Sequence, residues 1–127
     1  QFVIPKLAGR SGIKRLLSAI AESGVMSFLA VLKLFGEGNK HYLSFPFEGY
    51  TLSLDFKAHP KSLRLLDKLD ELVLELGGRL YLAKDARMSE SLFKSTYPDW
   101  FLFEEIRENY HASRKFSSLQ SKRLGLQ

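Results

Sequence analysis

The chain has 127 residues, of which 45% are hydrophobic and 26% charged, and this is the composition of one soluble globular domain. It has no cysteine, which excludes disulfides and thiolate metal sites, and charges interrupt every apolar run before the roughly 20 residues that span a bilayer. The net charge is +5, but four cations lie in the acid-free segment from residue 112 onward. Subtracting them leaves +1 for residues 1–111, so this part of the chain lacks the excess of positive charge that indicates nucleic-acid binding.

The amino-terminal part predicts a strand, a helix, a second strand and a loop. Residues 1–5 alternate and end in proline, which favours a short strand. Ser11 is a candidate N-cap for a helix that stops at residues 23–24, where a glycine follows a serine. The apolar stripe of this helix consists of Ile13, Leu16, Leu17 and Ile20. The dense apolar run 26–35 predicts a buried strand, and residues 36–48 predict a long irregular connection.

The remaining chain predicts a strand, a helix, a strand and two more helices. Residues 50–56 alternate, with Leu52, Leu54 and Phe56 on one face and Thr51, Ser53 and Asp55 on the other. Pro60 suits the first turn of a helix that ends at residues 77–78. Its stripe is Leu63, Leu66, Leu69, Val73 and Leu76. Residues 79–83 predict a strand, and 89–96 and 99–111 predict helices. The order predicts an α+β fold: a ferredoxin-like βαββαβ antiparallel sheet with its helices on one face, plus C-terminal helices.

Three features could carry chemistry. Lys33 interrupts an apolar run, and it either reaches solvent at a strand end or points as a cation into a pocket. Thr51, Ser53 and Tyr81 share the helix-free face of the predicted sheet. This face is either exposed to solvent without a ligand or a ligand site. Lys84 and Asp85 follow the last strand, and they form either a surface salt-bridge turn or part of that site. The three histidines lie far apart without ligand spacing, so no metal site is expected.

Several sequence blocks resemble a known family. They are FLAVLKLFG at 28–36, LSFP at 43–46, LDF at 54–56 and GGRLYLAKD at 77–85. Together they resemble the C-terminal part of FAD-linked oxidases of the vanillyl-alcohol-oxidase-type flavoprotein superfamily, nearer to its sugar-oxidising members than to the aldonolactone oxidases. The resemblance covers nearly the whole chain.

The resemblance implies that the substrate and most of the FAD are bound by different domains of one polypeptide. Residues 1–127 would be a single C-terminal substrate domain, and an N-terminal FAD-binding domain of the same polypeptide, absent from this chain, would hold most of the FAD. Gln1 comes without an initiator methionine or a leader, which also favours a piece of a longer polypeptide. The whole enzyme would oxidise a secondary alcohol of a sugar or sugar phospholipid by hydride transfer to flavin N5, and we expect this chain alone to be inactive.

The resemblance also assigns roles residue by residue. Gln1 matches a glutamine that borders flavin and substrate, and Lys33 matches a lysine that lines the substrate pocket. Tyr81 and Lys84 match a tyrosine and a lysine beside the flavin, and this lysine is needed for oxidation. Some family members carry asparagine and cysteine where this chain has Thr51 and Ser53. The exact sugar therefore stays open.

A rival interpretation comes from a different class: a noncatalytic ferredoxin-like module that binds RNA or a small regulator. An RNA-binding version should carry a basic-aromatic third strand, whereas residues 50–56 read YTLSLDF, with an acid on the open face. We therefore expect no nucleic-acid partner. We expect a cytoplasmic location, with peripheral contact to a membrane through the basic tail left open.

Overall fold

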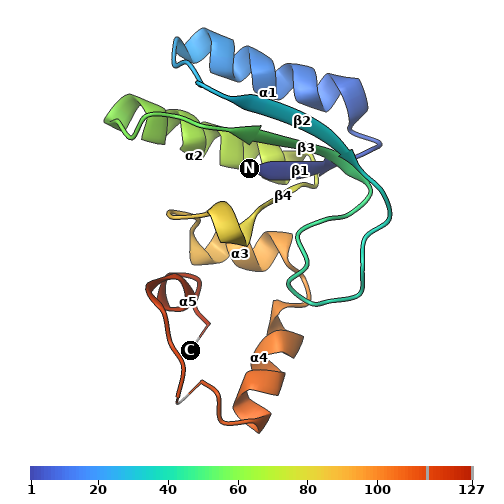
Figure 1. The fold of residues 1–127 in the computed structure, drawn as a ribbon, viewed down its shortest axis with the longest axis vertical. Helices are drawn as coiled ribbons and strands as arrows, with labels where there is room; N and C mark the ends of the chain where they lie inside the picture. Colours follow the sequence, from blue (N-terminus) through green and yellow to red (C-terminus); the bar gives the residue numbers. More distant parts are fainter. Residues whose placement is uncertain (114, 127) are drawn as a thin grey trace.

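The structure is a computed structural model that describes residues 1–113 and 115–126; Arg114, one of the cations of the basic tail, lies outside the described residues. A four-stranded antiparallel sheet organises the amino-terminal part, with strand order β2–β3–β1–β4 (Figure 1). The strands are β1 (Phe2–Pro5), β2 (Ala30–Phe35), β3 (Gly49–Leu54) and β4 (Arg79–Leu80). Helix α1 (Gly9–Ser23) joins β1 to β2, and α2 (Pro60–Glu75) joins β3 to β4. The ferredoxin-like α+β fold predicted from the sequence is confirmed.

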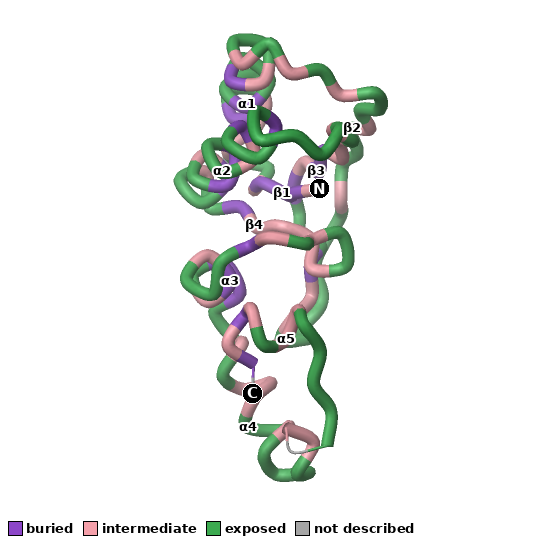
Figure 2. Tube along the Cα trace, turned by 90° about the vertical axis from the view of Figure 1, so that its left-hand side faces the viewer, coloured by how far each residue is buried: buried purple, intermediate pink, exposed green. Residues whose placement is uncertain are grey.

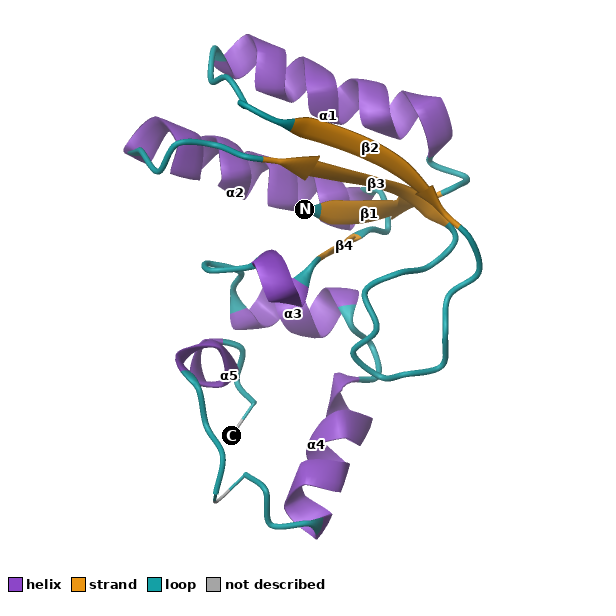
Figure 3. Ribbon diagram, in the orientation of Figure 1, coloured by secondary structure: helices purple, strands orange, loops and turns teal. Residues whose placement is uncertain are grey.

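The main core lies between the sheet and the two long helices, which cover the same face of the sheet (Figure 3). In the sheet register Phe2 lies opposite Leu52, and both side chains point toward the helices. The fully buried members of this core are Phe2, Ile4, Leu16, Ala19, Leu52, Leu65, Leu69 and Val73. Each large member contributes about 1.5–3 kcal/mol through burial, so this cluster supplies the main stabilisation of the sheet.

A second, smaller core lies under the carboxyl-terminal helices. After β4 come a 3₁₀ turn η1 (Leu82–Lys84) and helices α3 (Glu90–Thr96), α4 (Trp100–Asn109) and α5 (Leu119–Arg123). This core consists of Met88, Phe93, Tyr97, Leu124 and Leu126. Leu80 of β4 packs against both cores and so joins the two parts of the molecule.

Buried residues gather where the sheet meets α1 and α2, whereas α4 has no buried residue (Figure 2). Within the described residues, no helix combines the length and the apolar character that crossing a membrane requires.

Several local predictions are wrong. Of the strand predicted over residues 79–83, only Arg79–Leu80 is strand, and Leu82–Lys84 form the η1 turn. Helix α1 begins before Ser11, with Ala8 at the N-cap, and the Ser11 hydroxyl donates to the Ala8 carbonyl from inside the first turn. The run 26–35 is not a long buried strand. Only Ala30–Phe35 is strand, and it lies at the edge of the sheet with most of its residues exposed. Local sequence cannot distinguish an edge strand from a central one, because neighbouring elements decide its burial.

Candidate functional site

The sheet register brings the predicted site residues to the helix-free face. Because Phe2 and Leu52 point toward the helices, their neighbours along each strand point the other way. Lys33 of β2 lies opposite Thr51 of β3, and Ser53 follows two residues along the same face. The residues placed on this face or at its border are Gln1, Lys33, Thr51, Ser53, Tyr81 and Lys84.

Lys84 reaches back over the sheet. The chain leaves β4 through the η1 turn, which ends at Lys84, and the Lys84 Nζ donates to Ser53 Oγ over 3.3 Å. The Lys84 side chain is exposed, so its two other N–H groups face solvent or an approaching molecule. With Lys33 on the neighbouring strand, cations lie on both sides of the polar stripe of β3.

Thr51 holds Gln1 in place. The Gln1 Nε2 donates to Thr51 Oγ1 over 3.1 Å, and the same hydroxyl donates to the Phe2 carbonyl over 2.8 Å. Thr51 is only 1% exposed. Its hydroxyl is thus already paired as donor and acceptor, and the Gln1 amide is the group that borders the open face.

An aromatic row that sequence reasoning missed crosses the same face. Phe45, from the loop of residues 36–48, stacks on Tyr81 with ring centroids 4.5 Å apart. It also meets Phe35 edge-to-face at 5.9 Å. The LSFP block was the available signal, but the pairing with Tyr81 depends on how the loop folds back. The loop therefore forms one wall of the site.

Arg79 anchors this loop. Its Nη1 donates to the Ser44 carbonyl over 2.9 Å, and its guanidinium lies over the rings of Phe47 and Tyr97 at 4.9 and 5.1 Å. Burial lowers the pKa of Arg79 and raises the pKa of Tyr97, whose hydroxyl donates to the Leu80 carbonyl over 2.5 Å. The Arg79 Nε is buried without a partner among the described residues, so the anchor is not fully satisfied.

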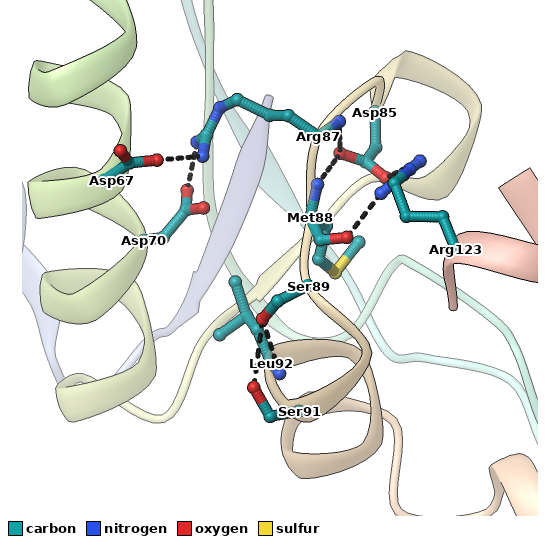
Figure 4. A network of polar contacts seen from close by, with 9 residues as sticks. All are labelled: Asp67, Asp70, Asp85, Arg87, Met88, Ser89, Ser91, Leu92 and Arg123. Atoms are coloured by element: carbon teal, nitrogen blue, oxygen red, sulfur yellow. Dashed lines mark hydrogen bonds and ion pairs between the residues drawn. The ribbon is translucent and has the colours of Figure 1, made fainter. Parts of the chain in front are cut away.

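A polar network supports the turn that carries Lys84 (Figure 4). The Asp85 carboxylate, 4% exposed, accepts from the backbone N–H groups of Arg87 and Met88 at 3.0 and 2.8 Å and from Arg123 Nη2 at 2.8 Å. Asp85 is therefore an internal anchor, and the interpretation of Lys84 and Asp85 as a surface salt-bridge turn is wrong. Arg123 of the basic tail is tied to the body as well, because it also donates to the Met88 carbonyl.

The network continues to α2 and α5. Arg87 donates to Asp67 over 2.8 Å and to the buried Asp70 over 2.7 Å, both on α2. Burial raises the pKa of the Asp70 carboxyl, although the Arg87 guanidinium acts in the opposite direction. From α5, Gln120 Nε2 donates to the Leu82 carbonyl over 2.6 Å. The η1 turn is thus held from both sides.

A cavity of about 540 Å³ opens beside these residues, between α2 and the ends of the strands. Gln1, Tyr81 and Lys84 line it, together with Asp55 and Asp70. Among its described lining residues, Lys33, Thr51 and Ser53 are absent, since they lie out on the sheet face. The predicted site thus divides into a part at the cavity and a part on the sheet, and Lys84 touches both.

The donor set favours an electron-rich, oxygen-bearing ligand. Two ammonium groups, the Gln1 amide and the Ser53 hydroxyl are hydrogen-bond donors, and the aromatic row packs beside them with Phe45 buried at 5% exposed. Such a set can hold hydroxyl groups and stabilise a developing negative charge.

Known proteins similar to the chain include an oxidase and an uncharacterized protein, and no protein-family model matches the chain. Over 126 residues, 99% of the chain, it is 40% identical to decaprenylphosphoryl-beta-D-ribose oxidase of Mycolicibacterium smegmatis, and the match covers 27% of that protein. Over 115 residues it is 39% identical to the "uncharacterized protein in mprA 5'region" of Streptomyces coelicolor, covering 90% of the chain and 31% of that protein.

The first relative is an oxidase, and its 40% identity over 99% of the chain confirms the resemblance predicted from the sequence blocks. The chain spans less than a third of the length of either relative.

Proposed function

We propose that this chain is the substrate-side part of an FAD-dependent oxidoreductase that oxidises a secondary alcohol of a sugar or sugar phospholipid. The observation that carries the proposal is the meeting of Lys84, Ser53 and Gln1 on one sheet face. The identity to an oxidase named for a decaprenylphosphoryl ribose supports the class of reaction and of substrate.

The described residues fit the ring side of a flavin better than its phosphates. The site offers cations, an amide and an aromatic row, whereas the sequence lacks a glycine-rich phosphate-binding fingerprint. Gln1, Tyr81 and Lys84 would border the cofactor, and Lys33 and Ser53 would hold the substrate. When bound, FAD supplies the acceptor for the hydride removed from the alcohol carbon. The remaining FAD contacts would come from an N-terminal domain of the same polypeptide.

Lys84 has the central role in this proposal. Its ammonium is directed toward the sheet by the hydrogen bond to Ser53 and its turn is anchored by Asp85, so it is placed to face a developing negative charge. Preorganised donors of this kind stabilise the transition state more than the bound substrate. Lys84 would also donate to the substrate oxygen, while Lys33 orients the sugar from the neighbouring strand.

The test uses the longer, flavin-containing polypeptide and decaprenylphosphoryl-β-D-ribose as the probe. We expect Lys84→Ala to slow anaerobic flavin reduction, followed by stopped-flow absorbance, by at least about tenfold, or roughly 1.4 kcal/mol. The matched control is Lys14→Ala, an exposed lysine of α1 on the opposite side of the sheet, which should leave the rate unchanged. A Lys84→Ala rate within a factor of two of wild type, with FAD still bound, would remove Lys84 from the reaction.

A further inference from the structure

Oxidation of a secondary alcohol to a ketone removes a hydride from carbon and a proton from oxygen. The electron pair of the C–H bond leaves with the hydride to the FAD of the proposed function, which is reduced. The electron pair of the O–H bond becomes the second bond of the carbonyl group, and the proton of that bond passes to a base. The ammonium groups and the amide of the candidate site are donors, so the base must be another group.

Asp55 extends the polar row of β3 toward the cavity. The pairing of β2 with β3 continues one residue past the end of β3, because the Asp55 N–H donates to the Leu29 carbonyl over 3.2 Å. Leu54 and Phe56 pack against the main core, so the Asp55 side chain between them points the other way, as that of Ser53 does. Asp55 also lines the cavity beside which the site lies.

The backbone of Asp55 is held in place. The Ser27 hydroxyl donates to the Asp55 carbonyl over 3.0 Å and accepts from the Asp55 N–H over 3.0 Å. The Phe28 N–H donates to the same carbonyl over 3.1 Å. The strand pairing and the serine together fix where the Asp55 side chain leaves the sheet.

The described lining of the cavity includes three carboxylates, and two of them are paired. Asp70 binds the Arg87 guanidinium, and Asp85 binds Arg123 and two backbone N–H groups. The Asp55 carboxylate takes part in no hydrogen bond or ion pair among the residues that the structure describes. It can therefore accept a proton without breaking an existing contact.

We propose that Asp55 is the catalytic base that takes the hydroxyl proton of the substrate. The inference rests on the proposed function, since only an alcohol that is oxidised gives up this proton. The substrate oxygen would accept a hydrogen bond from Lys84 and donate its own to Asp55, and both residues line the same cavity. Proton transfer would leave Asp55 as the neutral carboxylic acid and the substrate as the ketone.

Lys84 does not fill both roles at once. As an ammonium it stabilises negative charge on the substrate oxygen, but it has no lone pair with which to accept a proton. A carboxylate has lone pairs and no proton to donate. An ammonium and a carboxylate together thus give the reacting hydroxyl group both of the partners that its oxidation requires.

The test compares Asp55→Asn with wild type in the longer, flavin-containing polypeptide, with decaprenylphosphoryl-β-D-ribose as the probe. Asparagine keeps the size of aspartate and one acceptor oxygen, but it lacks the carboxylate that takes up a proton. We expect anaerobic flavin reduction at saturating substrate to slow by at least about hundredfold. The matched control is Glu71→Gln, at an exposed carboxylate of α2 outside the cavity lining, which should leave the rate unchanged.

Two further measurements separate proton transfer from binding and folding. The affinity for the substrate, measured by calorimetry on the polypeptide reduced with dithionite, should change by at most about threefold in Asp55→Asn, because no oxidation takes place there and the amide oxygen still accepts from the hydroxyl. The melting temperature should stay within about 2 °C of wild type, since the Asp55 side chain makes no polar contact among the described residues.

The possible failures are distinguishable. A reduction rate of Asp55→Asn within a factor of two of wild type would overturn the role of Asp55 while the oxidase assignment stands. A loss of substrate affinity with an unchanged rate at saturating substrate would make Asp55 a binding residue, and this too would overturn the proposal. A wild-type polypeptide whose flavin the substrate does not reduce would contradict the proposed function and, with it, the role of Asp55.

Discussion

Asp85 determines where the turn that carries Lys84 can lie. Its carboxylate accepts two backbone N–H groups and the Arg123 guanidinium while almost fully buried. Removing one partner from a buried ion pair leaves the other charge uncompensated, which is the costly direction. The position of Lys84 over Ser53 therefore depends on a residue that does not itself face the site.

We expect Asp85→Ala to lower the free energy of unfolding by about 3 kcal/mol, because it leaves the Arg123 charge and two backbone N–H groups without their partner. The measurement is urea unfolding of the isolated chain followed by circular dichroism. Asp67→Ala is the control, since Asp67 is 68% exposed in its pair with Arg87 and should cost at most about 1 kcal/mol. Equal losses in the two variants would mean that Asp85 is no special anchor.

Asp70 gives a prediction about pH. Its pKa is higher in the folded chain than the ordinary value of 3.8, because burial disfavours the carboxylate. The folded state therefore binds the proton more tightly, and the stability contributed by Asp70 is full below 3.8 and is lost as the pH rises through its folded pKa. We expect the free energy of unfolding of wild type minus that of Asp70→Asn to fall as the pH rises from 3.8 toward neutrality. If this difference instead rises with pH, the Arg87 guanidinium lowers the pKa of Asp70 by more than burial raises it.

At the scale of elements, the Gly77–Gly78 pair sets how α2 turns into β4. Gly77 has a φ of +72°, a left-handed conformation that ends the helix without strain only for glycine. At Gly78 the backbone passes so close to β1 that an added Cβ would lie 2.4 Å from the Val3 carbonyl oxygen and 2.9 Å from Val73 Cγ1. The close approach lets β4 pair with β1.

We expect Gly78→Ala to lower the free energy of unfolding by about 2–3 kcal/mol, because the added methyl group forces β1 and β4 apart. Gly36→Ala is the matched control: its Cβ would meet nothing within 4 Å, and the change should stay within about 0.5 kcal/mol. Thermal unfolding of both variants decides. An undisturbed Gly78→Ala protein would mean that β4 is held mainly by the network around Asp85.

Elements with local signals could be predicted, and those set by tertiary contacts could not. Glycines predicted the ends of α1 and α2, and the alternation of β3 predicted which of its side chains face the helices. The stripe of α2 was placed one position off at its start, since Ser62 and Leu65 are buried where Leu63 and Leu66 were predicted. Helix α5 was missed because one short turn carries no periodic pattern.

The candidate site shows the same division. Composition and spacing left Lys33 and Lys84 as open alternatives, and the family resemblance singled them out. The contact between Lys84 and Ser53 joins residues 31 positions apart, and Asp85 anchors a residue of the last helix. Neither contact has a local signature, since both depend on how the loop after β4 and the carboxyl-terminal segment fold back.

On the scale of the whole molecule, the exposed apolar side chains of the described residues include two groups. One is the β2 edge with Leu32 and Leu34, and the other follows α4 and the segment after it, where Phe101, Tyr110 and Phe116 are exposed. Large exposed apolar patches mark interaction surfaces. Two such regions on a chain that covers less than a third of its relatives are expected if it packs against further parts of a longer protein.

The last prediction concerns the cofactor. Tight FAD binding usually needs backbone N–H groups around the pyrophosphate, supplied by a glycine-rich loop at a helix N-terminus. The sequence has no such fingerprint, and in the proposed site the described residues would contact the ring side of the flavin. We therefore expect the isolated chain to bind FAD weakly or not at all. The measurement is a titration of FAD into the purified chain by calorimetry and flavin fluorescence, with Lys84→Ala as the comparison. A 1:1 complex of submicromolar affinity in the isolated chain would contradict the proposal that another domain supplies most of the FAD contacts, because these residues would then hold the whole cofactor themselves.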